Sequence, residues 1–473
     1  MTTCITETAE TDEYFEKRSL QGGAVGWLLL IGLGVSYTIS GDFSGWNYGM
    51  EQGGWLGLAI AWLVMGIMYL CIVFGLAELS SAIPTAGAGY GFARSAMGRT
   101  GGFATGLALI IEYVCAPAAI ALFIANYILA LGILPDWVTP VTIVVVAYLV
   151  FTAIHIIGVG EALKLMFVIS AIAIVALVGF VAGTIGSFDA TRLFDITPAA
   201  GSTAALPMGF SGVLGALPFG IWFFLGVEGV PLAAEESQDP RRDMPRGLIG
   251  ALAILALTGA ASLVFAAGSA GAAAIAGSDA PLVDALTAVG RPGLAVFVNW
   301  AALAGLIASF FSLMYAGSRQ IFALSRAGYL PSALSVTGSR KTPTIALVLQ
   351  ALIGICLVVV MGSGDLILNI AVFGACVSYA LMSMSHILLR VKSPQMPRAY
   401  RTPGGVITTG MGFALSCVAI VSTFFVDIVA AFCVLGFYIV GIAYFIVYSK
   451  KRLVSNAPEE EFAALVGAQS ELR

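Results

Sequence analysis

Long apolar stretches dominate this chain and predict that it spans a membrane. A helix needs about 20 mostly apolar residues to cross the hydrocarbon core of a bilayer. Twelve such stretches lie near residues 24–49, 55–80, 101–131, 138–157, 162–185, 211–236, 247–267, 293–323, 343–361, 365–390, 404–425 and 427–449. We therefore expect an all-α membrane fold with twelve transmembrane helices in a lipid bilayer.

The composition agrees with this pattern. Of the 473 residues, 59% are hydrophobic and 10% are charged, whereas a soluble domain carries about 25% charged residues. The formal charge of −4 offers no basic surface, so nucleic acid is excluded as a partner. The seven cysteines and two histidines form no metal-binding spacing, and no catalytic motif is present. We therefore expect neither an enzyme nor a protein that holds a metal or a cofactor.

The basic residues predict the orientation of the chain in the membrane. If the N-terminus is cytoplasmic, 20 of the 22 lysines and arginines fall on the cytoplasmic side. Only Arg192 and Arg291 lie on the other side. Since basic residues accumulate in cytoplasmic loops, we expect both termini to be cytoplasmic.

Two of the apolar stretches are interrupted near their middle. The first contains SGDFSG at residues 40–45, and the sixth contains LGVEGVP at residues 225–231. Unwound backbone is tolerated in a membrane only where it is buried in protein or lines a cavity. Interrupted helices in corresponding positions of two halves are the best sequence indication of a substrate site in a transporter.

The spacing of these breaks predicts an inverted repeat of five plus five helices. Residues 24–185 would form the first half and residues 211–390 the second. Residues 404–449 would add two C-terminal helices, and residues 1–23 and 450–473 would be cytoplasmic tails.

Several motifs resemble the amino acid–polyamine–organocation (APC) transporter superfamily. They are WFFLGVE at 222–228, AEES at 234–237, DPRRDMPR at 239–246, ELS at 78–80 and SRQIFALSRAGYLP at 318–331. Within the superfamily, GVSYTISGDFSGWN at 34–47 resembles the first helix of bacterial ethanolamine permeases. The resemblance implies a secondary active transporter, such as a symporter, that works by alternating access in the bacterial cytoplasmic (inner) membrane.

Asp42 favours an amine as the substrate. In amino-acid carriers of the superfamily, the first break is a small-residue turn whose backbone N–H groups hold the substrate carboxylate. Asp42 would repel that carboxylate and attract an ammonium, so we expect ethanolamine. A charged side chain at the bilayer centre costs about 2.5–3.5 kcal/mol on insertion scales and is functional by default. The alternative for Asp42 is a role as a helix cap.

Other functions stay open at this point. The chain could carry an amino acid, γ-aminobutyrate or a polyamine, as other members of the superfamily do. A protein of another class, an amine-binding membrane sensor or a channel, is a further alternative. The oligomeric state, monomer or dimer, is not readable from the sequence.

The candidate substrate-binding residues lie mainly in the two breaks. By the resemblance, Trp222 corresponds to the aromatic residue that closes over the substrate, and other aromatic residues could add cation–π attraction. Serines and break backbone could bind the ethanolamine hydroxyl. The full set is Ser40, Gly41, Asp42, Phe43, Trp46, Trp222, Gly226 and Ser378.

Candidate coupling and gating residues are Glu112, Glu228, Ser309 and Ser312. Glu228 resembles a family glutamate proposed to sense protonation, and the two serines could help to bind sodium. Proton-coupled relatives often carry a lysine in helix five, where this chain has Ala173. Coupling to H⁺, coupling to Na⁺ and uncoupled exchange therefore all remain possible. We expect Glu235 and Glu236, opposite the basic residues at 241, 242 and 246, to form a cytoplasmic gate or a capping network.

Overall fold

A computed structural model describes residues 17, 22–23, 25–131, 134–157, 159–338, 340–454, 457–458, 460–461 and 463–464. The predicted tails, residues 1–23 and 450–473, lie largely outside these ranges. The described residues form helices and loops, with one isolated bridge between Val25 and Ser237. The predicted all-α membrane fold is therefore confirmed.

The helices follow the predicted apolar stretches. They are α2 (Trp27–Thr38), α3 (Ser40–Phe43), α4 (Tyr48–Ala82), α5 (Ala88–Ala130), α6 (Pro140–Ile157), α7 (Val159–Thr184), α8 (Gly209–Trp222), η3 (Val227–Glu236), α9 (Pro240–Ala270), α10 (Ala272–Ala276), α11 (Pro281–Ala288), α12 (Pro292–Arg326), α13 (Thr344–Met361), α14 (Gly364–Lys392), α15 (Val406–Val426) and α16 (Ile428–Val447). Short 3-10 turns η1 (Ile185–Ser187), η2 (Ala190–Phe194), η4 (Ser332–Ser335) and η5 (Ser449–Lys451) complete the set.

Eleven helical segments in the described part of the chain are long and apolar enough to cross a membrane. α2 is a shorter apolar helix of 12 residues and corresponds to the first half of the predicted first stretch. α4 joins the end of the first stretch to the second across a turn at Gly54, where φ is 70°. The exact number of twelve and the five-plus-five repeat stay predictions.

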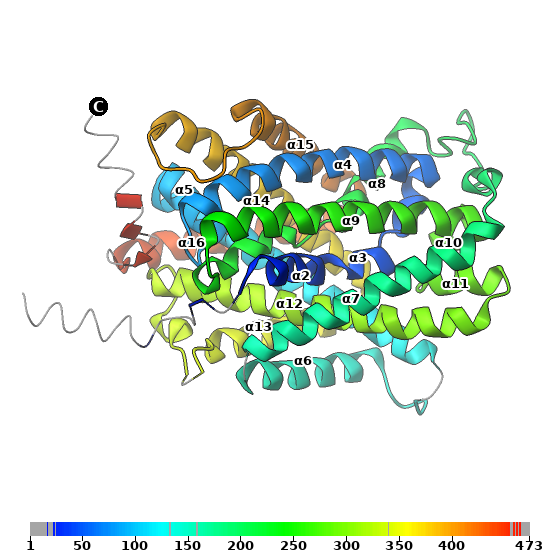
Figure 1. Ribbon diagram of the computed structural model, residues 1–473, viewed down its shortest axis with the longest axis horizontal. Coiled ribbons are helices and arrows are strands. Elements are labelled where there is room, and N and C mark those ends of the chain that lie inside the picture. The colour runs from blue at the N-terminus through cyan, green and yellow to red at the C-terminus, as the bar shows by residue number, and fades with distance from the viewer. Residues whose placement is uncertain are drawn as a thin grey trace, which may run out of the picture.

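The helices lie side by side along the long axis of the molecule (Figure 1). α5 packs against α14 and α12 in the interior of the bundle. α6 and α15 lie on opposite sides of the view, and α10 and α11 lie at the end far from the C-terminus. Apolar side chains of α6, α13 and α16 are exposed, as expected of helices that face lipid.

α4 and α8 approach each other closely because small residues face each other across their contact. A methyl group on Gly53 would lie 2.6 Å from the Gly212 carbonyl oxygen. A methyl group on Gly220 would lie 2.7 Å from the backbone of Ala61. Small residues allow membrane helices to pack backbone against backbone. This contact holds the helix that ends at Trp222 against α4.

We expect Gly220→Ala to lower the thermal stability of the purified protein. The added methyl group meets backbone atoms, which cannot rotate away, and overpacking of this kind costs about 1–3 kcal/mol. Gly410→Ala is the matched control, because no atom lies within 4 Å of its added methyl group. Thermal unfolding in detergent checks both variants, and equal midpoints for the two would contradict the close packing of α4 on α8.

Candidate substrate and coupling sites

The first interrupted helix changes direction in two steps. α2 ends at Thr38, and α3 forms one helical turn. The backbone is then extended at Ser44, with φ −154° and ψ 154°, and turns at Gly45 with φ 89°. Asp42 therefore lies in a short helical turn, whereas the sequence predicted a break over all of residues 40–45.

The sixth interrupted helix breaks slightly earlier than predicted. α8 ends at Trp222, and the chain turns through Gly226, where φ is 106°. η3 then continues as a 3-10 helix to Glu236. The break therefore begins at Phe223 and not at Leu225, and Pro231 lies inside the 3-10 helix.

The two breaks contact each other directly. The Thr38 hydroxyl donates a hydrogen bond to the Leu225 carbonyl oxygen at 3.0 Å, and Trp222 Nε1 donates to the Ser44 carbonyl oxygen at 2.9 Å. A methyl group on Gly41 would lie 2.6 Å from the Trp222 carbonyl oxygen, so only glycine allows this approach. Each break thus satisfies polar backbone groups of the other, as a membrane interior requires.

The carboxylate of Asp42 is buried without a hydrogen-bonding partner. The side chain is 0% exposed, and neither carboxylate oxygen accepts a hydrogen bond. None of the ion pairs among the described residues includes it. Thr258 of α9 lies beside it, but the Thr258 hydroxyl donates to the Ile254 carbonyl oxygen at 3.1 Å. Because an isolated buried charge is costly, this carboxylate requires a cation or a proton.

Aromatic side chains surround the Asp42 carboxylate on its α9 side. Gly259 of α9 marks the place where these side chains meet. A methyl group on Gly259 would lie 3.3 Å from Asp42 Oδ1. The same methyl group would lie 3.2 Å from Trp62 Nε1 and 2.9 Å from Phe223 Cδ1. The ring of Trp46 lies 5.5 Å from the ring of Phe223. A carboxylate beside aromatic rings is an arrangement that suits an ammonium group.

The other aromatic candidates face different neighbours. A methyl group on Gly305 of α12 would lie 3.2 Å from Phe43 Cε2 and 3.5 Å from Ala173 Cβ, so Phe43 packs toward α12 and α7. The Trp222 ring meets the Phe123 ring edge-on at 6.2 Å. Trp46 therefore contacts Phe223, which lies beside Asp42, while the Phe43 and Trp222 rings pack against other elements.

The candidate serines of α12 lie beside the first break. The Ser40 N–H donates to Ser309 Oγ at 3.0 Å, so the structure brings these two candidates together. Ser312 Oγ is buried without a hydrogen-bonding partner. Ser378 of α14 donates to the Ala375 carbonyl oxygen at 2.8 Å, within its own helix.

Glu112 and Glu228 form a second buried acidic site, where α5, η3 and α14 meet. The Tyr379 hydroxyl lies 3.4 Å from Glu112 Oε1 and 3.0 Å from Glu228 Oε2. Glu228 also accepts hydrogen bonds from the Gly226 N–H at 3.1 Å and from the Tyr113 hydroxyl at 3.3 Å. Glu112 Oε2 has no partner. Glu228 therefore has the donors that a charged carboxylate needs, and Glu112 has fewer.

Ion pairs join the end of η3 to α12. Glu235 binds Arg326 at 2.7 Å, and Glu236 binds Arg319 at 2.9 Å. Both arginines are 3% exposed. These partners differ from the expected basic residues at 241, 242 and 246, because η3 packs against α12. The sixth helix is thus closed against α12 at the end of the molecule that carries the described parts of both tails.

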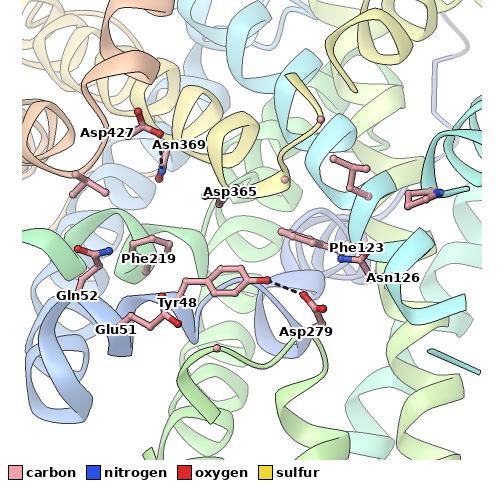
Figure 2. Close-up of a pocket in the computed structure, with 16 residues that line it drawn as sticks. Tyr48, Glu51, Gln52, Phe123, Asn126, Phe219, Asp279, Asp365, Asn369 and Asp427 are labelled. Carbon is pink, nitrogen blue, oxygen red and sulfur yellow. Dashed lines mark hydrogen bonds between the residues drawn. The ribbon is translucent and has the colours of Figure 1, made fainter. Parts of the chain in front are cut away.

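A cavity of about 500 Å³ opens at the opposite end of the bundle. Figure 2 shows Tyr48 at its centre, with the hydroxyl donating to Asp279 Oδ1 at 3.2 Å, and with Phe123 and Phe219 nearby. Acidic and amide side chains line much of the wall, and none of the lining residues is a lysine or an arginine.

This architecture is that of a membrane transporter. Interrupted helices that contact each other, a buried acidic side chain beside them and a cavity at one end of a helical bundle are features of secondary transporters. The family model described as "Amino acid permease" matches residues 28–455. The chain belongs to this family, within the APC superfamily, and is a multi-pass membrane transporter.

Three relatives illustrate the range of the similarity. The chain is 27% identical to the branched-chain amino acid permease of Bacillus subtilis, over 85% of this chain and 87% of that protein. It is 25% identical to the L-asparagine permease of Streptomyces coelicolor, over 82% and 79%. It is 27% identical to the methylthioribose transporter of Bacillus subtilis, over 79% and 81%. The relatives are thus not named for one substrate class.

The fold also matches a solved transporter structure. A mutant of the manganese transporter of Eremococcus coleocola superimposes with a TM-score of 0.56, covers 95% of both chains and shares 14% of its sequence. At this identity the likeness shows the fold alone.

Sequence reasoning missed several residues of both sites. Thr258, Gly259 and Trp62 lie inside ordinary apolar stretches and reach Asp42 only through the packing of α9 and α4. Tyr379 is likewise hidden in α14. Gln350 of α13 donates to the Tyr113 carbonyl oxygen at 2.8 Å. Of these five residues, only Gln350 could have been singled out from the sequence, because it is a polar side chain within an apolar stretch.

We expect Thr38→Val to loosen the contact between the two breaks. Valine keeps the shape of threonine but leaves the Leu225 carbonyl oxygen without its 3.0 Å hydrogen bond. An unsatisfied buried acceptor costs about 1–3 kcal/mol. Thr423→Val is the control, because the Thr423 hydroxyl bonds only within its own helix, to Ile420. A lower unfolding midpoint and slower substrate uptake are expected for Thr38→Val alone, and equal behaviour of the two variants would contradict this role.

Proposed function

We propose that this transporter carries a small protonated amine without a carboxylate, and that the amine is ethanolamine. The observation that carries the proposal is the fully buried Asp42 carboxylate, which accepts no hydrogen bond and lies beside aromatic side chains. An ammonium group would supply the positive charge and three hydrogen-bond donors. The likeness of residues 34–47 to ethanolamine permeases supports the same substrate.

The first break is poorly suited to a substrate carboxylate. The Ser40 N–H is bonded to Ser309 Oγ, and the Asp42 N–H is bonded to the Ile39 carbonyl oxygen at 3.1 Å. A carboxylate approaching these amides would find both donors occupied and the negative Asp42 side chain close by. An amino alcohol has no such group, and its hydroxyl could bind Ser312 Oγ, which lacks a partner.

An amino acid is the second candidate substrate. The relatives named for branched-chain amino acids and asparagine favour it. Under this alternative, which extends to γ-aminobutyrate and polyamines, Asp42 would serve as a helix cap. A sensor or channel has less support, because the chain belongs to a permease family.

Alternating access would open the ends of the bundle in turn. The basic residues predict that both termini are cytoplasmic, which would make the end closed by Glu235–Arg326 and Glu236–Arg319 the inner one. The cavity lined by Asp279 would then face outward. Opening inward would require these two ion pairs to separate while the cavity closes.

For the coupling ion we favour H⁺, carried by Glu112 and Glu228. Two neighbouring buried carboxylates without a cation between them are costly when both are charged. Tyr379 contacts both carboxylates, and the better-supplied Glu228 would carry the charge while Glu112 would carry the proton. The alternative is Na⁺ at Ser309 and Ser312.

We expect Asp42→Asn to insert and fold but to lose at least about tenfold in ethanolamine uptake. The variant removes an uncompensated buried charge, so its thermal stability should equal or exceed that of the parent. An ammonium bound there would then lack its counter-charge, which is costly in a buried site. Asp136→Asn, an exposed carboxylate on the α5–α6 connection, is the control. Uptake of labelled ethanolamine into proteoliposomes checks this, and an Asp42→Asn rate within about twofold of the parent would overturn the proposal.

We expect Glu112→Gln to separate substrate binding from ion coupling. Glutamine keeps the size of the side chain but cannot carry the proton, so an inward pH gradient should no longer drive accumulation. Exchange of internal for external ethanolamine should persist. Glu461→Gln, an exposed carboxylate near the C-terminus, is the control. Unchanged pH-driven accumulation by Glu112→Gln would exclude the carboxyl pair as the proton carrier.

A further inference from the structure

Beyond α16, the chain folds back onto the bundle. The Ser449 hydroxyl of η5 donates a hydrogen bond to the Tyr329 carbonyl oxygen at 2.7 Å. The Val454 N–H donates to the Ala327 carbonyl oxygen at 3.1 Å. The described residues 452–454, 457–458, 460–461 and 463–464 form what we name the C-terminal strap. Chain ends are usually poorly ordered unless contacts tie them down, so the contacts of this strap need a reason.

Gly328, in the connection that follows α12, is suited to receive the strap. Its φ is 85°, and a methyl group on it would collide with the Arg452 carbonyl oxygen and lie 3.0 Å from Leu453 Cα. Both the positive φ and the close approach favour glycine. The connection after α12 therefore accepts the backbone of the strap directly.

Glu460 ties the strap to the start of α5. Its side chain is 4% exposed, and that of Arg94 is 15% exposed. Arg94 Nε donates to Glu460 Oε1 at 2.8 Å, and Arg94 Nη2 donates to Oε2. The Tyr329 hydroxyl also donates to Glu460 Oε1, at 3.2 Å. A bidentate arginine–carboxylate pair that is shielded from water is among the stronger polar contacts in proteins, so this pair is the main anchor of the strap.

The apolar contacts of the strap are small. Ala457 is 0% exposed and packs in a cluster whose aromatic members are Tyr90, Phe103, Tyr329 and Phe445. These rings pack on one another, with 4.9 Å between the Phe103 and Phe445 rings and 5.5 Å between the Tyr90 and Tyr329 rings. The seat of the strap thus has its own packing. A segment with so few buried contacts can open locally without unfolding the structure beneath it.

The strap is anchored to the same two elements that hold Glu235. Glu235 accepts a hydrogen bond from the Ala86 N–H, just before α5, at 2.8 Å, and pairs with Arg326 at the end of α12. Tyr329 belongs to the end of α12 as well, because its N–H donates to the Leu324 carbonyl oxygen at 2.8 Å. The strap therefore joins the start of α5 to the end of α12, and Glu235 closes the sixth helix against both.

We propose that the C-terminal strap is a latch for the end of the bundle that Glu235 and Glu236 close. Docked on Arg94 and Tyr329, the strap stabilises the closed arrangement, and its release favours opening at that end. The strap fits the spacing of α5 and α12 at the closed end and loses its anchor when that spacing changes. A contact made in one state only shifts the equilibrium toward that state. The proposal rests on the alternating access of the proposed function and is independent of the substrate's identity.

The first test follows opening with a reporter cysteine, Ala234→Cys. Ala234 lies in η3 beside Glu235 and is 1% exposed. Glu460→Gln, and separately a deletion of residues 453–473, should each raise the rate of maleimide labelling of this cysteine in purified protein by about threefold or more. Glu461→Gln is the control, because that neighbouring carboxylate is exposed. The same variants without Ala234→Cys give the labelling of the native cysteines.

The second test asks whether the ion pair itself holds the latch. Arg94→Gln should speed labelling as much as Glu460→Gln does. The double variant should label no faster than either single variant, because each change removes the same pair. Additive effects of the two changes would overturn the latch. Labelling of both Glu460→Gln and the deletion variant at the rate of Glu461→Gln would overturn it as well.

Thermal unfolding separates a latch from a contact that only stabilises the fold. A lower unfolding midpoint for Glu460→Gln without faster labelling of the folded protein would overturn the latch. Labelling needs no substrate, so the two proposals fail separately. Strap-dependent labelling in a protein that takes up no ethanolamine would overturn the proposed function alone. Ethanolamine uptake by a protein whose labelling ignores the strap would overturn the latch alone.

Discussion

The need to satisfy polar groups away from water governs this structure. Two interrupted helices bring irregular backbone into the bundle, and each break supplies partners for the other, as in the bond from Thr38 to the Leu225 carbonyl oxygen. Gly41 makes this possible because a side chain there would meet the Trp222 carbonyl oxygen. Against this background Asp42 is an exception, since its carboxylate is buried and unpaired. The proposed substrate follows from that exception.

The two ends of the bundle on either side of Asp42 differ in how their charges are balanced. At one end, Glu235 and Glu236 are neutralised by buried arginines of α12, which closes the sixth helix against that helix. At the other end, carboxylates line an open cavity without basic residues among its walls. A cation therefore meets an attractive surface at the open end and closed ion pairs at the other. This asymmetry agrees with the proposed cationic substrate.

The sequence predicted the all-α membrane fold and the positions of the two breaks, and the candidate site residues stay predictions. Hydrophobic stretches locate the helices because lipid requires long apolar segments, and the breaks were visible through Asp42 and the glycines around it. The partners of these residues were not predictable, because Thr258, Gly259 and Trp62 are ordinary residues of apolar stretches until α9 and α4 pack together. For the same reason the arginines that bind Glu235 and Glu236 come from α12 and not from the neighbouring sequence.

The most direct test of the account is a competition measurement with purified protein in proteoliposomes. Uptake of labelled ethanolamine would be challenged with excess alanine, arginine, γ-aminobutyrate, putrescine and choline. The account predicts saturable ethanolamine uptake that amino acids with a carboxylate compete for poorly, because Asp42 repels that group. Uptake of alanine or arginine in place of ethanolamine would contradict it, and would make Asp42 a helix cap in an amino acid permease.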